Sequence, residues 1–273
     1  MTSVHWGESV EIERLDSGLG AGVIGRVGYA VIDRPDRLNA LSRAVLRDLA
    51  EVVDSYSEDD EVWVVVVGAT GDRAFSAGAD LKEVNEDDRT NGRIPRPMVG
   101  PMRNAFEVVL ECGKPTIAAM NGVAAGGGFE LALACDLRVA SENASMGLTE
   151  AKRGMGALFG SVVLPRLVPP AIAFEMLYLG ELVPAIDAQR WGLVNRVVPR
   201  AELEATVSAL AADLLLRAPL TLRRYKAMVS RTRELPISAA LRVDVRPDPY
   251  GSEDRVEGVA AFLERRAPRW LGR

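Results

Sequence analysis

Two glutamates and two turns of small residues are the parts of this chain whose types and spacing could do chemistry. Glu130 stands just after the glycines of residues 126–128, and Glu150 follows it by twenty residues. The run GGGFELALA predicts the start of a helix, where backbone N–H groups are free donors at the positive end of the helix dipole. Glycines let a ligand oxygen approach those donors closely. The pattern therefore indicates an oxyanion hole beside a group that exchanges protons.

Each of these parts also has a purely structural interpretation. A glutamate in the first turn of a helix favours the helix dipole by about 0.3–1 kcal/mol. The small residues of FSAGADLK, residues 75–82, could serve only close packing between a strand and a helix, and taken alone they favour that interpretation. Glu150 alone is equally consistent with a capping or surface glutamate. Glu130 differs because it stands in an apolar segment, where burying a carboxylate without a purpose is costly, and it therefore favours a functional site.

Alternating strand and helix patterns must position these residues. The hydrophobic spacing predicts strands at residues 10–15, 27–32, 62–67, 116–120, 137–140 and 193–198. It predicts helices at residues 42–56, capped by Asn39 or Ser42, at 106–112, 127–134 and 201–228, and within 252–273. Residues 18–25 and 68–80 are predicted to form a glycine-rich turn and a loop. The prolines and glycines of residues 86–101 predict a surface loop, which we expect to cover one end of the site.

The composition excludes several classes of protein. The chain has 273 residues, a net charge of −5 and no basic run long enough for nucleic-acid binding. Its longest apolar run, residues 62–69, is too short to cross a bilayer, and its first residues lack the pattern of a secretory signal. Cys112 and Cys135 do not make a disulfide framework and are predicted to be small buried hydrophobes of a cytoplasmic protein. The single histidine, His5 in the N-terminal tail, excludes most histidine metal sites and Ser–His or Cys–His triads.

Two carboxylates and two N–H donors, without histidine or metal, suit the chemistry of a thioester. Donors that polarise the thioester carbonyl acidify its α-carbon or activate its β-carbon, and enolate charge then develops on the thioester oxygen. One carboxylate can deprotonate a water while the other delivers a proton to carbon. We therefore expect neither a metal nor a redox cofactor.

Motifs along almost the whole chain resemble the enoyl-CoA hydratase/isomerase (crotonase) superfamily. They are the loop at residues 75–82, the run at 114–136, the segment around Glu150, RP at 34–35 with LNAL at 38–41, and residues 188–194 with VVP at 197–199. The resemblance implies an α/β fold in which a crotonase-like spiral of ββα units, residues 1–200, holds the active site. It also implies a C-terminal helical region, residues 201–273, that drives trimerisation into a homotrimer or a homohexamer.

The resemblance further implies roles for individual residues. The N–H groups of Ala79 and Gly127 would form the oxyanion hole. Glu130 would position and activate the water, and Glu150 would exchange a proton with the α-carbon. The CoA part of an acyl-CoA substrate would be held by Arg37, Leu38, Ala40, Ala77, Asp80, Leu81 and Lys82. Candidates for its phosphates are Lys82 and Arg265 or Arg266. The CoA thioester is the substrate, and no further cofactor is implied.

This chain departs from the hydratase pattern after Glu150. Hydratases of the mitochondrial type carry Gly-Ala-Gly-Gly there, whereas residues 156–160 read GALFG. Leu158 and Phe159 thus add bulk where the acyl group and the water are expected, so short-chain crotonyl-CoA is not expected to be the best substrate. Residues 190–198 and 252–273 resemble a branch that includes carnitinyl-CoA dehydratase-like proteins.

The predicted activity is the reversible hydration of a 2-enoyl-CoA to a 3-hydroxyacyl-CoA. A Δ3-Δ2 enoyl-CoA isomerase and a specialised acyl-CoA dehydratase of the carnitinyl-CoA type use the same scaffold and are alternatives. A non-catalytic acyl-CoA-binding subunit is a third alternative. The two glutamates argue against it, because a carrier needs no pair of carboxylates at a thioester.

Overall fold

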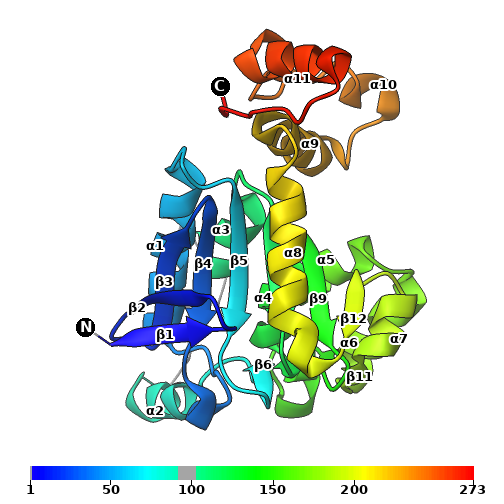
Figure 1. The fold of residues 1–273 in the computed structure, drawn as a ribbon. Helices are drawn as coiled ribbons and strands as arrows, with labels where there is room; N and C mark the ends of the chain where they lie inside the picture. The colour runs from blue at the N-terminus through cyan, green and yellow to red at the C-terminus, as the bar shows by residue number, and fades with distance from the viewer. Residues whose placement is uncertain (1, 92–102) are drawn as a thin grey trace.

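The larger of two sheets runs through the middle of the protein, whose computed structural model describes residues 2–91 and 103–273 (Figure 1). Its eight strands lie in the order β1-β2-β3-β4-β5-β7-β9-β12, antiparallel from β1 to β4 and parallel from β4 onward. They are β1 (Ser3–Trp6), β2 (Val10–Arg14), β3 (Leu19–Ile24), β4 (Val27–Ile32), β5 (Val64–Ala69), β7 (Thr116–Met120), β9 (Leu137–Ser141) and β12 (Arg196–Val198).

A smaller sheet has four short strands in the order β11-β10-β8-β6. Its strands are β6 (Ala74–Ser76), β8 (Val123–Ala125), β10 (Ser145–Gly147) and β11 (Val183–Pro184). Along the chain, each of the pairs β5–β6, β7–β8 and β9–β10 gives one strand to the larger sheet and the next to the smaller one. A helical segment follows the second strand of each pair, so the chain winds as repeated ββα units. The predicted α/β class and spiral are therefore confirmed.

Helices cover the sheets and continue beyond them. The helices of the first two hundred residues are α1 (Arg43–Glu58), α2 (Leu81–Asn91), α3 (Ala105–Glu111), α4 (Gly127–Ala134), α5 (Leu158–Val163), α6 (Pro170–Leu179) and α7 (Ala185–Arg190), with 3-10 helices at Pro35–Arg37, Thr149–Arg153 and Leu164–Arg166. The later ones are α8 (Leu203–Leu215), α9 (Pro219–Thr232), α10 (Ile237–Ala240) and α11 (Glu253–Glu264), with 3-10 helices at Arg200–Glu202 and Pro249–Gly251. Figure 1 shows α9, α10 and α11 together beyond one end of the larger sheet.

The larger sheet is apolar on both faces, and β5 shows this most clearly. All six of its residues are buried, as the run of valines predicts for a covered parallel strand. Val65 and Val67 pack in the core that the sheet shares with α1, α3 and α4. Val64 and Val66 face the opposite way, into a second core that includes residues of α8. Cys112 and Cys135 are free and buried in the first core, as predicted.

Local sequence signals explain where several helices begin. Ser42 caps α1, its hydroxyl accepting the N–H of Val45 at 3.2 Å, and one face of α1 is buried against the sheet. Asn104 caps α3 with a reciprocal capping box, in which the Asn104 backbone N–H donates to the Glu107 carboxylate. The expected helix over residues 127–134 is confirmed in full as α4.

The glycine-rich segment at residues 18–25 is not a turn but the strand β3. Glycine is needed in β3 because side chains of β1 and β2 pack directly against its backbone. A Cβ on Gly20 would lie 2.9 Å from Cβ of Val4, and one on Gly22 would lie 2.8 Å from Cγ2 of Ile12. His5, expected in a tail, stands in β1, the strand at the edge of the same sheet. Glycine permits these close strand contacts. Because glycines are also typical of turns, the sequence alone led to the wrong prediction.

Three further boundaries differ from the predictions. The loop expected at residues 68–80 contains the strand β6. The helix expected over 201–228 is divided between α8 and α9, because Pro219 cannot continue a helix and instead begins the next one. Residues 86–91 continue α2 rather than starting a loop, since the first proline of that segment comes later; residues 92–101 lie outside the described residues. The division of the chain at residue 200 stays a prediction.

No single helix within residues 2–91 and 103–273 is long and apolar enough to cross a membrane. The segment Arg200–Leu215 and α9 pass that test of length and composition only as a pair, and the pair is bent by 102°.

Candidate active site

Three parallel strands of the smaller sheet end side by side and deliver the predicted site residues. Ser76 of β6 and Met146 of β10 both pair with Ala124 of β8. Because the carboxyl ends of parallel strands meet at one edge of a sheet, the segments that follow β6, β8 and β10 start close together. Ala79, Gly127 and Glu150 lie two or three residues beyond those strand ends. The repeated ββα unit thus gathers pieces that are far apart in the sequence.

The N–H groups of Ala79 and Gly127 lie close together. Leu41 bonds to the residues on either side of Ala79: its N–H donates to the Gly78 carbonyl at 2.8 Å, and its carbonyl accepts from Asp80 at 3.2 Å. The Ala79 N–H is left out of that pairing. Gly127 is the first residue of α4, where an N–H has no partner within the helix. A Cβ on Gly127 would lie 3.8 Å from the Ala79 nitrogen. Neither N–H donates a hydrogen bond to any residue that the structure describes.

Glycines around these donors are required by the approach of two main chains. A Cβ on Gly128 would lie 2.2 Å from the Ser76 carbonyl oxygen. A Cβ on Gly78 would lie 2.6 Å from the Ala125 carbonyl oxygen, and Gly78 also has a φ of +85°. Side chains at these positions would push the turn after β6 away from the start of α4. The glycine-rich pattern therefore reflects both packing and the exposure of N–H groups.

Glu130 is buried in the first core, one turn into α4. Its side chain is nearly inaccessible, and its Oε1 accepts the backbone N–H of Gly160 at 2.7 Å. The pKa of Glu130 is raised to about 7, mainly by burial and also by the charge of Glu150, while the N–H groups of Gly160 and Phe159 oppose the rise. Glu130 therefore titrates near neutral pH, as a group that must take up and release a proton would.

Glu150 is the second buried carboxylate of the site, in the 3-10 helix Thr149–Arg153. A Cβ on Gly126 would lie 3.0 Å from its Oε1, so the carboxylate stands against the glycines that begin α4. Its Oε2 is buried and has no hydrogen-bond partner within the described part of the chain. Burial raises the pKa of Glu150, opposed by its own backbone N–H and by the charge of Arg153. An unpartnered buried carboxylate oxygen is costly unless something else binds there.

The residues predicted to hold CoA come from two neighbouring segments. The Ala77 N–H donates to the Leu38 carbonyl at 2.9 Å, which joins the segment after β4 to the segment after β6. The predicted residues differ in exposure. The exposed ones are Arg37, Ala77, Leu81 and Lys82. Leu38 is half-buried, and Ala40 and Asp80 are buried.

The structure does not bring Arg265 or Arg266 to the other predicted phosphate ligand, Lys82, within one chain. Figure 1 shows α11, which they follow, and α2, which carries Lys82, at opposite ends of the protein. Arg266 is instead paired with Glu257 and Glu264. The sequence could not show this, because the distance between the two helices depends on how α9 leaves α8.

An aromatic pair borders the donors. The rings of Phe106 and Phe159 lie 5.7 Å apart between centroids, and a Cβ on Gly127 would meet Cζ of Phe106 at 3.5 Å. Phe159 is buried, whereas Leu158 beside it is partly exposed. The bulk expected at residues 158 and 159 therefore lies partly in the core. The place of Phe106 in the site was not predicted from the sequence. The only available signal was its position at the start of a predicted helix, shortly before the glycine motif.

Gly160 is a further site residue that sequence reasoning missed. It reads as one more small residue of the GALFG segment, yet its N–H binds Glu130. The contact joins α5 to α4 across thirty residues, which no local pattern reveals. Among the described residues, no group of three or more His, Cys, Asp or Glu side chains is placed to hold a metal ion.

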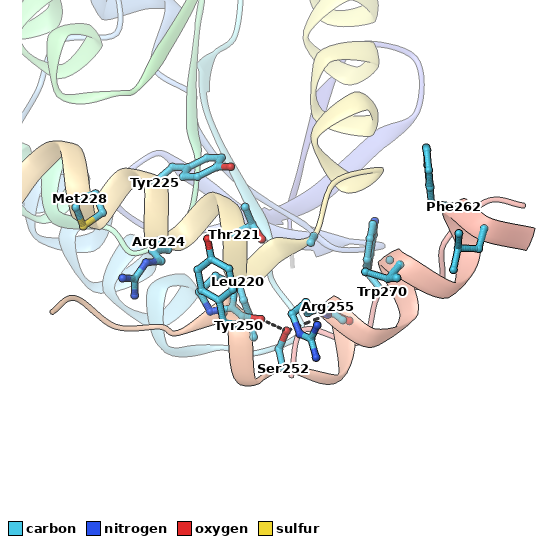
Figure 2. A pocket seen from close by; sticks show the side chains of 16 residues that line it. Leu220, Thr221, Arg224, Tyr225, Met228, Tyr250, Ser252, Arg255, Phe262 and Trp270 are labelled. Atoms are coloured by element: carbon cyan, nitrogen blue, oxygen red, sulfur yellow. Dashed lines mark hydrogen bonds between the residues drawn. The ribbon is translucent and has the colours of Figure 1, made fainter. Parts of the chain in front are cut away.

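One hollow in the described structure lies away from these carboxylates. A groove of about 650 Å³ runs between α9, the 3-10 helix Pro249–Gly251 and α11 (Figure 2). Its walls are mostly apolar and include Tyr225, Tyr250, Phe262 and Trp270. No group assigned to the chemistry lines it, so the candidate active site rests on the strand ends and not on this groove.

Comparisons with known proteins identify relatives of this chain. A family model described as enoyl-CoA hydratase/isomerase matches residues 25–273. The carnitinyl-CoA dehydratase of Escherichia coli strain K12 is 39% identical over 257 residues, covering 91% of this chain and 96% of that protein. The carnitinyl-CoA dehydratase of Salmonella typhi is 40% identical over 250 residues, covering 89% and 94%.

Solved structures show the same likeness. The crystal structure of enoyl-CoA hydratase from Mycobacterium tuberculosis H37Rv superposes with a TM-score of 0.83 at 32% identity, covering 94% of this chain and 99% of that one. The enoyl-CoA hydratase of Bacillus anthracis gives a TM-score of 0.83 at 32% identity, covering 94% and 100%. The ββα spiral, the match of the family model and these relatives together show that the chain belongs to the enoyl-CoA hydratase/isomerase (crotonase) superfamily.

Proposed function

We propose that this protein catalyses the reversible hydration of a 2-enoyl-CoA thioester to a 3-hydroxyacyl-CoA. The observation that carries the proposal is the placement of two buried carboxylates, Glu130 and Glu150, against the segment that presents the Gly127 N–H. Family membership supports an acyl-CoA substrate and an enzymatic role. The positions of the residues support the particular reaction.

The proposed step adds water across the carbon–carbon double bond. Ala79 and Gly127 donate hydrogen bonds to the thioester oxygen, which draws electrons from the double bond. The water oxygen bonds to the β-carbon while Glu130 takes one of its protons. Negative charge reaches the thioester oxygen as an enolate, and Glu150 then gives a proton to the α-carbon. Overall, one O–H bond of water and the π bond of the alkene are broken, and one C–O and one C–H bond are formed.

The protonation states needed for this step are consistent with the environment of each carboxyl. Hydration needs one ionised carboxylate and one protonated carboxyl. Burial raises the pKa of both Glu130 and Glu150, and the charge of Glu150 opposes ionisation of Glu130. Two such neighbours titrate as a pair, so protonation of one favours ionisation of the other. The Gly160 hydrogen bond favours the charged form at Glu130, which supports its role as the base.

Dehydration of a 3-hydroxyacyl-CoA is the second candidate, and the relatives favour it. The proteins that are 39–40% identical to this chain are named carnitinyl-CoA dehydratases. Removal of water is the reverse of the proposed step, with Glu150 taking the α-proton and Glu130 protonating the departing hydroxyl. A Δ3-Δ2 isomerisation would instead move a proton between carbons at the same site, with no oxygen added.

We propose further that the chain forms a homotrimer or a homohexamer through its C-terminal helices and works in the cytoplasm without a cofactor beyond its CoA substrate. Large apolar side chains stand exposed on α9, α10 and α11, among them Val229, Ile237 and Phe262. Apolar surface of this extent favours contact with another copy. The groove in Figure 2 lies within the same helices.

The decisive experiment follows the ultraviolet absorbance of the conjugated enoyl thioester across a panel of 2-enoyl-CoAs, with Glu150→Gln as the control. Loss of absorbance with the wild type but not with the variant supports hydration. Appearance of the absorbance from 3-hydroxyacyl-CoAs supports the dehydratase. Oxygen from labelled water in the product separates hydration from isomerisation, and loss of the β-hydroxyl oxygen as water identifies dehydration. Binding of every ester with no change in any of them leaves a non-catalytic subunit and rejects the proposal.

A further inference from the structure

Arg34 joins the segment after β4 to the turn after β6, which carries the Ala79 N–H donor. Its guanidinium contacts the carboxylate of Asp80 at 3.0 Å and donates to the Ala40 carbonyl at 2.5 Å. The side chains of Arg34 and Asp80 are 18% and 8% exposed, so this ion pair is shielded from water. Shielded, charge-assisted contacts of an arginine fork hold geometry more firmly than a surface pair does.

The Asp80 end of this pair is next to the donor. The Asp80 backbone N–H donates to the Leu41 carbonyl, and the Oδ1 of Asp80 accepts the N–H of Lys82, the second residue of α2. Asp80 is therefore held by its main chain, by the helix that follows and by Arg34. Ala79 lies between Gly78 and Asp80, which both form hydrogen bonds with Leu41. The positions of these two neighbours therefore determine the direction of the Ala79 N–H.

The other end of the segment is anchored to the sheet. Asn39 has a φ of +54°, and its side-chain amide donates to the carbonyls of Thr70 and Ala74. Its Oδ1 accepts the Arg34 backbone N–H at 2.9 Å. Arg34 is thus fixed at its backbone by the sheet while its guanidinium reaches the turn after β6. It acts as a rigid link from the sheet to the donor turn.

We propose that Arg34 is a positioning residue, which aims the Ala79 N–H at the thioester oxygen through its ion pair with Asp80. The inference rests on the proposed function of the site and concerns a residue that would act through Asp80, whose carboxylate its guanidinium contacts. Hydrogen-bond donors act on a developing oxyanion only when they are already aligned, and a shift of about 1 Å can cost about 10²-fold in rate. Loss of Arg34 should therefore reduce the polarisation of the carbonyl more than the binding of the CoA ester.

The test uses a saturated acyl-CoA with a ¹³C-labelled thioester carbonyl, which the protein binds but cannot hydrate. Infrared difference spectra give the shift of the carbonyl stretch on binding, and titration gives the dissociation constant. In Arg34→Gln we expect at least half of the shift to be lost, with less than a threefold change in dissociation constant. With a reactive 2-enoyl-CoA, kcat should fall by about 10–100-fold. Asp80→Asn, of nearly the same shape, should reproduce the loss, and the double variant should be no worse than either single variant.

The matched control is Arg14→Gln. Arg14 pairs at 2.6 Å with Asp33, the residue before Arg34; this ion pair is more exposed than that of Arg34 with Asp80 and does not reach the turn after β6. It should leave the carbonyl shift unchanged. A shift that survives in both Arg34→Gln and Asp80→Asn, or a loss of binding with an unchanged shift, overturns the role of Arg34. Absence of any shift in the wild type instead rejects the proposed oxyanion site, so the two failures are distinguishable. Should Arg34→Gln not fold, Asp80→Asn decides alone.

Discussion

Gly160 donates its backbone N–H to Oε1 of Glu130, and there is no room for a side chain where it does so. The bond is 2.7 Å long. A Cβ on Gly160 would lie 2.6 Å from Cδ1 of Leu148 and 3.3 Å from the same Glu130 oxygen. The start of α5 is thus held against α4 by a main-chain contact to a buried carboxylate. Position 160 therefore influences the protonation of Glu130 without supplying a functional group.

Gly160→Ala should move this N–H away from Glu130. The methyl group would press on Leu148, an overpacking that costs about 1–3 kcal/mol, and loss of the N–H should raise the pKa of Glu130 further. The limb of the kcat/KM profile on which activity rises with pH should shift to higher pH. Gly156→Ala is the control, because its methyl would find only an ordinary contact with Leu158 at 3.4 Å. Identical pH profiles for both variants would contradict the role assigned to Gly160.

Glu150→Gln and Glu130→Gln should each abolish hydration while leaving CoA-ester binding largely intact. Either variant removes one of the two proton exchanges but keeps the shape of the side chain. The measurements are steady-state rates with the best substrate and dissociation constants for a saturated ester. Rates near that of the wild type in both variants would show that the chemistry resides elsewhere.

The stability of the protein should depend on pH through Glu130. Its pKa rises from 4.5 to about 7 on folding, so the folded state binds the proton more tightly. That contribution is complete below about pH 4.5 and is lost as pH rises through 7; at about 1.4 kcal/mol per pKa unit it is ~3 kcal/mol. Glu130→Gln should therefore be more stable than the wild type at pH 8, with the difference vanishing near pH 4.

Urea unfolding at both pH values measures this difference. Glu257 provides a control of opposite sign, because hydrogen bonds from Arg266 lower its pKa to about 2. Glu257→Gln should be less stable than the wild type at pH 8, and its deficit should shrink as pH falls. A stability gain of Glu130→Gln that is the same at pH 4 and pH 8 would argue against a buried charge at Glu130.

Phe106→Ala should change which acyl groups are accepted. Its ring stands beside the position of a Cβ on Gly127 and packs on Phe159, so its removal opens space next to the donors. We expect kcat/KM for branched or longer 2-enoyl-CoAs to rise about tenfold relative to crotonyl-CoA. Phe106→Leu should show a smaller change in the same direction with less loss of stability. Phe174→Ala, which removes an exposed aromatic ring of α6, should leave the preference unchanged.

Phe262→Asp should weaken self-association. The Phe262 side chain is 82% exposed in α11, and a charge there would oppose burial against another copy. Light scattering after size exclusion should show a trimer or hexamer for the wild type and smaller species for the variant. Ile24→Asp changes a partly exposed apolar residue outside the C-terminal helices and serves as the control. Equal masses for all three proteins would place the interface elsewhere.

The longer elements could be predicted from the sequence because their hydrophobic patterns are long. The valines of β5, the cap and apolar face of α1 and the glycine start of α4 each carry a local physical signal. The smaller sheet was missed because β6, β8 and β10 have three residues each, too few to show a period. These short strands are nevertheless what brings the site segments together.

The site shows the same division between local and distant signals. Glu130 could be predicted as a site residue because burying a carboxylate in the apolar first turn of a helix is costly. Glu150 required the family resemblance, since its burial depends on packing against Gly126. The contacts of Arg34 with Asp80 and of Gly160 with Glu130 could not be predicted, because the two residues of each contact lie 46 and 30 residues apart in the sequence.

The close approach of Gly78 and Gly128 to facing carbonyls determines which parts of the site can vary. No side chain fits at either position, and the donors beside them are main-chain groups that few substitutions can delete. Glu130 and Glu150, in contrast, can be exchanged one base change at a time. A laboratory search for new thioester reactions on this scaffold should therefore collect its substitutions at the carboxylates and the aromatic wall. The carbonyl-polarising half of the site would be inherited unchanged by every active descendant.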